Sequence, residues 1–376
     1  MKKTLVALAA LSAVSVFAQS SVTIFGTADA GLAIGNGSAA NFIGLRNSGL
    51  ASSALGFRGV EDLGGGMKAS FHLEGTAQTD DGLGAGTSTN NQAVGAFVPA
   101  TGANAPVTAG TQGFTFGRRA YVALGGGWGE VRLGREYAPH FWNYTFYDPF
   151  GTNGVGTTLA LSGPTLQGVP AGHRATIVRA SNAINYVGNF SGFGVNLMTY
   201  FGENTSAAVA PATNSDGSGS SVRLSYDAGP LSLGLGFGKT TVAATVVGAA
   251  SDVGFTNLGA SYNMGFMTLM GNWAKEAVNV NGTTNDRTGW TLGVAAPVGA
   301  GTVKASLSRS TANIAGNPNL QQFALGYVHG LSKRTQLYAT VASMTAADGA
   351  TPSLNGSGGA VNSSASGFDL GVRHSF

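Results

Sequence analysis

The stretch Ser366-Gly-Phe-Asp-Leu-Gly-Val-Arg-His-Ser-Phe376 ends the chain and decides its fold class. Its side chains alternate between two sets: Phe368, Leu370, Val372, His374 and Phe376 against Asp369, Gly371, Arg373 and Ser375. Because successive side chains of a strand point to opposite faces, one face suits lipid and the other suits water. The pattern is typical of a strand in the wall of a transmembrane barrel. A soluble β-sandwich can end on a similar strand, so the ending needs support from the rest of the chain.

The amino terminus has the order of a secretory signal peptide. Two lysines precede an apolar run from Leu5 to Val16, and the run closes at a plausible cleavage site after Ala18. The run is too short to cross a bilayer as a helix. We therefore expect residues 1–18 to be a signal peptide and residues 19–376 to form the mature domain. The alternative is a buried N-terminal helix.

The composition points away from helical proteins and ordinary soluble enzymes. The chain has 60 glycines and 10% charged residues, whereas typical domains carry about 25% charged residues. No later segment offers the ~20 uninterrupted apolar residues of a membrane helix, so any membrane span must use strands. Cysteine is absent, which excludes disulfides and thiolate metal sites. The nearly neutral mature chain also lacks the clustered basic residues that nucleic-acid binding requires.

No motif for catalysis, metal binding or cofactor binding stands out. The histidines are scattered without metal-ligand spacing: His72, His140, His173, His329 and His374. There is no Gly-x-Ser-x-Gly elbow, and local motifs do not assemble a nucleophile, a histidine and an acid. We therefore expect no catalytic residue, no metal and no cofactor.

Amphipathic segments come in pairs joined by tight turns, and longer polar stretches separate the pairs. Residues that tolerate turn dihedrals mark seven such turns: Asp62–Gly66, Gly125–Gly129, Asn189–Gly194, Ala228–Pro230, Asn263–Gly265, Pro297–Gly301 and Gly330–Arg334. With the first and last segments closing the ring, the turns divide the chain into sixteen strands. Short turns at one end and long loops at the other are typical of a bacterial outer-membrane barrel. The sequence therefore predicts an all-β, sixteen-stranded antiparallel transmembrane barrel.

One face of several strands is unusually rich in glycine and serine. Leu231, Leu233, Leu235 and Phe237 alternate with Ser232, Gly234, Gly236 and Gly238. A soluble sandwich would normally carry many more lysines and glutamates on its polar face. Small residues there suit a barrel wall that also packs against loops or neighbouring subunits, and closure of the barrel removes its open edges.

Several motifs resemble one family in particular. They are Ser21-Val-Thr-Ile-Phe-Gly-Thr-Ala-Asp-Ala-Gly, Leu55-Gly-Phe-Arg-Gly-Val-Glu-Asp-Leu-Gly-Gly-Gly-Met-Lys-Ala, Gly129-Glu-Val-Arg-Leu-Gly-Arg-Glu-Tyr, Phe323-Ala-Leu-Gly-Tyr-Val-His-Gly-Leu-Ser-Lys-Arg-Thr and the closing Gly371-Val-Arg-His-Ser-Phe. In this order they resemble the general trimeric porins of Gram-negative outer membranes, closest to the β-proteobacterial branch, over essentially the whole mature chain.

The resemblance implies a multi-pass protein of the outer membrane, assembled as a homotrimer and in contact with outer-membrane lipid and lipopolysaccharide. It also implies a passive channel for small hydrophilic solutes and ions, and no enzyme. A final strand that ends in phenylalanine is similar to the segment that the barrel-assembly machinery recognises, so Phe376 is the expected assembly signal.

The same resemblance places a constriction loop at about 137–176, the third long loop, folded into the barrel. Its aromatic residues would be poorly placed on an exposed hairpin, because exposed aromatic clusters favour burial. They are Phe141, Trp142, Tyr144 and Phe150. We favour packing of these side chains onto the wall over direct contact with solutes.

Family members set ion selectivity with wall arginines that face acidic groups on this loop, since fixed charges in a narrow pore bias ion concentrations. Arg118 and Arg179 match two positions of the arginine cluster. At the third, this chain has Ala54 in place of arginine, and Arg58 lies nearby on the expected lumenal face. Asp148 is the expected loop acid, because it is the only acidic residue between positions 137 and 176.

Two further arginines are less certain members of the cluster. Arg174 lies within the loop segment and is a further candidate for the constriction. Arg118 and Arg119 are adjacent, so strand alternation would send them to opposite faces. We expect Arg118 to point inward and Arg119 to point toward a subunit contact or the membrane interface.

The charges at the constriction predict a weak anion preference. The alternative is that these charges pair with one another and leave little net effect. Two alternatives for function stay open. One is a substrate-specific channel for sugars or organic acids, with an aromatic track along the lumen. The other is an outer-membrane barrel enzyme, which would need fewer strands and a nucleophile beside a histidine.

Overall fold

The computed structural model describes residues 21–84, 91, 97–98, 103–104, 113–163, 177–204, 213–244, 248–249 and 251–376. The proposed signal peptide lies outside these residues, as do loop residues 164–176 with Arg174. Within the described part, no helix has the length and apolar character needed to cross a bilayer.

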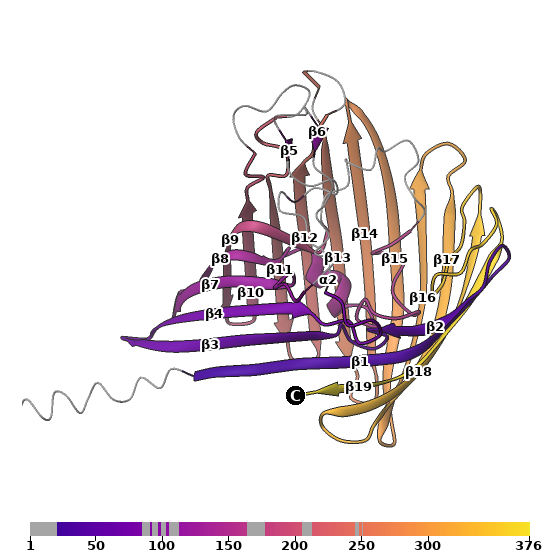
Figure 1. The fold of residues 1–376 in the computed structure, drawn as a ribbon, viewed down its shortest axis with the longest axis horizontal. Coiled ribbons are helices and arrows are strands. Elements are labelled where there is room, and N and C mark those ends of the chain that lie inside the picture. The colour runs from indigo at the N-terminus through magenta and orange to yellow at the C-terminus, as the bar shows by residue number, and fades with distance from the viewer. Residues whose placement is uncertain are drawn as a thin grey trace, which may run out of the picture.

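One antiparallel sheet forms the wall of the molecule (Figure 1). Its strands are β1 (Ser21–Gly37), β2 (Phe42–Asn47), β3 (Ala54–Gly64), β4 (Met67–Thr76), β7 (Arg119–Gly126), β8 (Gly129–Tyr137), β9 (Arg179–Phe190), β10 (Phe193–Tyr200), β11 (Gly219–Ala228), β12 (Leu231–Thr241), β13 (Asp252–Asn263), β14 (Thr268–Val280), β15 (Thr283–Val298), β16 (Gly301–Asn313), β17 (Asn319–Gly330), β18 (Thr335–Ala347) and β19 (Ser364–Ser375). A separate two-stranded pair, β5 (Phe97–Val98) and β6 (Ala103–Asn104), and one short helix, α2 (Phe141–Phe146), complete the described elements.

The sheet closes into a barrel because β1 pairs with β19. β2 and β3 pair with successive parts of the same strand, β1, so together they fill one position of the wall. The barrel therefore has sixteen strand positions, as the sequence predicts. All seven predicted tight turns join neighbouring strands, from β3–β4 to β17–β18.

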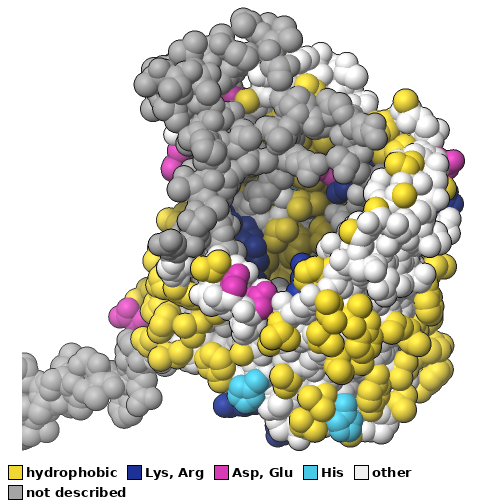
Figure 2. Space-filling view, turned by 45° about the vertical axis from the view of Figure 1, so that its right-hand side comes forward, with side chains coloured by type: hydrophobic (Ala, Val, Ile, Leu, Met, Phe, Trp, Pro, Cys, Tyr) yellow, Lys and Arg dark blue, Asp and Glu magenta, His cyan; other side chains and the backbone are white. Residues whose placement is uncertain are grey.

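The predicted alternation is confirmed in the closing strand. Leu370, Val372 and Phe376 are 49%, 42% and 49% exposed, whereas Asp369 on the opposite face is buried. β17 and β18 repeat this pattern, and Figure 2 shows apolar side chains covering much of the lower outer surface. Such a surface would promote aggregation in water, and in a bilayer it matches the hydrocarbon core.

The segment after β8 folds into the barrel, where α2 lies inside the wall (Figure 1). Helix α2 contacts β12 and β13. Three inner-face glycines make room for the segment: a Cβ at Gly234, Gly259 or Gly293 would collide with Asn143, Tyr147 or Pro149, respectively. The glycine-rich inner face that the sequence shows is therefore the surface on which this loop packs.

Candidate functional site

A cavity of about 410 Å³ lies between the inward loop and one arc of the wall. Figure 2 shows the opening of the barrel, with lysine or arginine side chains visible inside it. Residues from the β2–β3 connection, β4, β7, β8, β9 and the loop line the cavity: Ala51, Ser52, Glu74, Arg118, Arg119, Tyr137, Phe141, Trp142, Thr145, Gly151, Thr152, Asn153, Leu161, Val178 and Arg179. The cavity thus brings residues of the inward loop opposite the charged residues of the wall.

Arg118 and Arg179 meet at the hydroxyl group of Tyr137. An Nη2 group of each arginine donates to this oxygen, at 2.6 Å from Arg118 and 2.7 Å from Arg179. The guanidinium carbon of Arg179 also lies 4.3 Å from the centre of the Tyr137 ring. Arg118 has a second partner, because its Nε donates to the carboxylate of Glu74. The hydroxyl group of Tyr137 thus holds the two positively charged groups next to each other.

Arg119 lies in the same cavity, so the expectation that it points outward is wrong. Its Nε donates to Glu136 at 2.8 Å, and its guanidinium carbon lies 5.5 Å from the centre of the Trp142 ring. The alternation rule applies only within a strand, and β7 begins at Arg119. Arg118 occupies a bend before the strand, which lets both side chains enter the lumen.

Arg58 lies apart from this group. It is exposed on β3, opposite His72 of β4 in the register, and its guanidinium carbon lies 5.0 Å from the ring centre of Phe25. It does not line the cavity. Ala54, at the third position of the arginine cluster, is buried at 7% exposure and carries no charge.

The aromatic residues of the loop divide into two groups. Phe141, Tyr144 and Phe150 are buried, at 7%, 1% and 5% exposure. Phe141 and Trp142 both line the cavity, and Trp142 stacks on Phe146, with ring centres 5.2 Å apart. Phe146 itself is 50% exposed. Packing thus accounts for most of these side chains, while Trp142 and Phe146 present aromatic surface to the lumen.

Asp148 is directed into the loop and does not face the arginines. Its carboxylate accepts backbone N–H groups of Phe150 and Thr152 at 3.0 Å and of Thr158 at 3.3 Å. The side chain is 3% exposed and does not line the cavity. Burial raises the pKa of Asp148 to about 6, while the three backbone donors and the Lys304 ammonium act in the opposite direction. The residue shapes the loop tip.

Glu74 and Glu136, which the sequence analysis missed, are the carboxylates beside the arginines. Glu74 pairs with Arg118 and Glu136 pairs with Arg119. Glu74 lies on the same face of β4 as His72, and His72 lies opposite Arg58. Strand alternation could therefore have placed Glu74 in the lumen, although nothing local shows which arginine it meets.

Two buried aspartates fix the segments that border the cavity. Asp29 accepts backbone N–H groups of Leu50 at 2.8 Å and Ala51 at 2.6 Å, and the hydroxyl group of Tyr338 at 2.7 Å. It thereby holds the connection between β2 and β3 against β1. Asp369 accepts the backbone N–H of Val155 at 2.7 Å, which ties the inward loop to β19.

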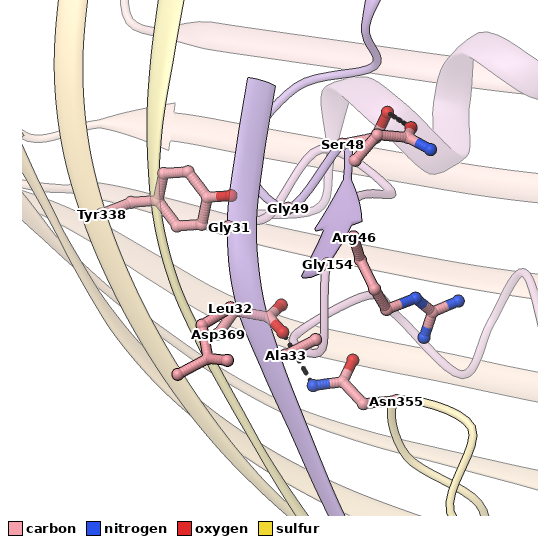
Figure 3. A pocket seen from close by; sticks show the side chains of 11 residues that line it. Gly31, Leu32, Ala33, Arg46, Ser48, Gly49, Gly154, Tyr338, Asn355 and Asp369 are labelled. Atoms are coloured by element: carbon pink, nitrogen blue, oxygen red, sulfur yellow. Dashed lines mark hydrogen bonds between the residues drawn. The ribbon is translucent and has the colours of Figure 1, made fainter. Parts of the chain in front are cut away.

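Asp369 also borders a smaller cavity of about 160 Å³, shown in Figure 3. There its carboxylate accepts the side-chain amide of Asn355 at 2.7 Å, and Arg46 projects from β2 on the other side (Figure 3). Asn355 belongs to the connection between β18 and β19. This junction joins the inward loop, the last long loop and the wall. In the part of the chain that the structure describes, no group of three His, Cys, Asp or Glu side chains could hold a metal ion.

Comparisons with known proteins agree with this architecture. A family model described as Gram-negative porin matches residues 4–349. The chain is 37% identical over 390 residues to outer membrane porin protein 32 of Delftia acidovorans, with 100% of both chains covered. An outer membrane porin protein of Bordetella pertussis is 27% identical over 394 residues, covering 90% of this chain and 93% of that protein.

Solved structures agree as well. An anion-selective porin from Comamonas acidovorans superposes with a TM-score of 0.77 at 35% identity, covering 95% of this chain and 100% of that one. OmpT of Vibrio cholerae has a TM-score of 0.63 at 13% identity, covering 95% and 98%, a likeness of fold alone. The closed barrel, the inward loop and full-length similarity together show that the chain belongs to the Gram-negative porin family, whose members reside in the outer membrane.

Proposed function

We propose that this protein forms a water-filled channel for the passive diffusion of small hydrophilic solutes and ions, with a weak preference for anions. The balance between arginine and carboxylate side chains around the cavity supports this proposal. Three guanidinium groups line it, and two of them are paired with carboxylates. The remaining positive charge attracts anions into the narrow region. The similarity to an anion-selective porin supports the same preference.

Assembly and localisation follow the same family pattern. We propose a homotrimer that contacts outer-membrane lipid and lipopolysaccharide, exported by a signal peptide over residues 1–18 and inserted by the barrel-assembly machinery through the strand that ends at Phe376. One of the similar solved structures is described as a trimer form. The exposed apolar outer face supports contact with lipid.

Reversal potentials of the purified channel in a salt gradient test the proposal. Wild-type protein should favour chloride over potassium, and the double variant Arg118→Gln, Arg179→Gln should shift toward cations because the lumen loses two positive charges. The shift should be larger in dilute salt, where the Debye length grows from about 8 Å to about 30 Å. Lys239→Gln is the control, because Lys239 is 64% exposed and pairs with Asp252 at 3.3 Å away from the cavity. An unchanged reversal potential in the double variant would contradict the proposed role of the arginines.

The alternative of a substrate-specific channel has one observation in its favour. Trp142 lines the same cavity as the arginines, and Phe146 stacks beneath it. Phe146 is 50% exposed and Trp142 is partly exposed, so the pair offers aromatic surface close to the charges of the cavity.

A further inference from the structure

Two arginines lie over an aromatic pair on α2, of which Phe146 is exposed and Trp142 is partly exposed. Trp142 and Phe146 are four residues apart, so they lie on the same face of the helix. Their rings are nearly parallel, with 14° between the planes. The guanidinium carbon of Arg119 lies 5.5 Å from the Trp142 ring centre, and that of Arg223 lies 5.1 Å from the Phe146 ring centre. Cation–π contacts on both rings reduce their freedom and present a rigid aromatic surface.

Arg223 is itself anchored, because its Nε donates to the side-chain oxygen of Asn143 at 2.7 Å. Asn143 in turn donates to Asn257 of β13 at 2.7 Å. Wall residues therefore contact the aromatic pair at two places: Arg119 at Trp142 and Arg223 at Phe146. Trp142 also packs against the buried cluster of Tyr137, Phe141 and Tyr144, with its ring centre 4.8 Å from that of Tyr137, and its remaining surface lines the cavity.

Arg179 is the cavity arginine best placed to bind a carboxylate. Arg118 pairs with Glu74 and Arg119 pairs with Glu136. For Arg179, the residues that the structure describes provide the hydroxyl of Tyr137 but no carboxylate within salt-bridge distance. Its Nε is buried and has no hydrogen-bond partner among the described residues. The buried Nε does not reach the cavity, but a guanidinium group that lines a cavity and has no carboxylate partner suits an anionic solute, because its charge strengthens each hydrogen bond to a carboxylate.

From these contacts we infer that the cavity is a transient binding site for small aromatic carboxylates of the benzoate class. The carboxylate binds Arg179, and the ring lies against the part of Trp142 that lines the cavity and is not covered by Phe146, Tyr137 or Arg119. This inference rests on the proposed function and names a class of anions that the channel binds briefly as they pass. The cavity volume of about 410 Å³ falls within the range of ~300–1,000 Å³ found for small-molecule pockets. A saturated acid of similar size gains the same charge contact but not the aromatic stacking.

Block of single-channel chloride current tests the inference. Benzoate and cyclohexanecarboxylate are added in turn to one side of a planar bilayer, and the half-blocking concentration of each is measured. Benzoate should block at a concentration about 3- to 10-fold lower, the effect expected of one aromatic pair. Trp142→Leu should remove this difference, and Arg179→Gln should weaken block by both acids. Trp128→Leu is the matched control, because Trp128 lies in the β7–β8 turn, stacked on Tyr186 outside the cavity.

The preference for benzoate and the preference for anions in potassium chloride can fail independently of each other. Equal half-blocking concentrations in wild type would overturn the inference, as would a benzoate preference that survives Trp142→Leu. Either result leaves an anion preference in plain potassium chloride intact. A wild-type channel without anion preference in potassium chloride would instead contradict the proposed function, and a benzoate preference that depends on Trp142 would still support the site. Where Trp142→Leu yields no inserted channels, Phe146→Leu tests the same pair.

Discussion

Replacement of Glu74 by glutamine should increase the anion preference of the channel. Glu74 lines the cavity and pairs with Arg118. A unit charge acts on an ion about 7 Å away in water with about 0.6 kcal/mol, and at 0.1 M salt screening roughly halves this energy. Removal of the negative charge therefore raises the local anion concentration by a factor of about 1.7 and lowers that of cations equally. The anion-to-cation permeability ratio should rise about threefold.

Reversal potentials in a potassium chloride gradient centred near 0.1 M measure this ratio. Arg179→Gln should lower the ratio by a similar factor, and the double variant Glu74→Gln, Arg179→Gln should return close to wild type. All three effects should shrink in 1 M salt, where the Debye length is about 3 Å. Glu61→Gln is the matched control, because Glu61 is exposed on β3 away from the cavity. If Glu74→Gln leaves the anion-to-cation permeability ratio unchanged, or lowers it, then Glu74 does not oppose the charge of the cavity arginines.

Two further predictions concern assembly and the loop. Deletion of Phe376 should sharply reduce the yield of heat-dissociable oligomer in the outer membrane, because its backbone N–H and C=O pair with Gly26 at 3.1 Å and close the β1–β19 seam; normal yield would count against this role. Gly259→Ala should push Tyr147 from the wall, cost about 1–3 kcal/mol by overpacking and change single-channel conductance. Gly271→Ala, where a Cβ meets only ordinary contacts, is the control that should leave conductance unchanged.

The fold could be predicted from the sequence because each strand carries its own evidence. Alternation fixes which face of a strand is apolar, and glycine-rich turns fix where the chain reverses. In the closing strand, both signals give the observed arrangement of Leu370 and Asp369. One detail was not predicted, the break between β2 and β3. It depends on Asp29, whose carboxylate binds backbone groups more than twenty residues away, and no local pattern encodes that contact.

The cavity was harder to predict, because its contacts also depend on parts of the fold that no local sequence pattern encodes. Loops have no period, so nothing local shows that Asp148 turns toward the backbone of its own loop. The bend before β7 brings Arg118 and Arg119 to one face, against the expectation from alternation. Glu74 lies 44 residues before Arg118 in the chain, and the pairing of β4 with β7, which places Glu74 opposite Arg119, brings the two together.

The glycines of the inner wall determine which side chains a solute meets. They are concentrated where the loop packs, as Gly234 on β12, Gly259 on β13 and Gly293 on β15 show. The charged side chains that line the cavity lie on another arc, formed by β4, the start of β7 and the start of β9, whereas Arg223 and Arg287 contact the loop itself. Because α2 and the loop tip occupy the glycine arc, we expect solutes to pass on the side of Arg118 and Arg179, which line the cavity. An ion that passes close to these arginines feels the field of their positive charge, and even one unpaired guanidinium group raises the local concentration of anions. We therefore expect the glycine pattern to influence selectivity together with the arginines, since larger residues at Gly234, Gly259 and Gly293 would displace the loop.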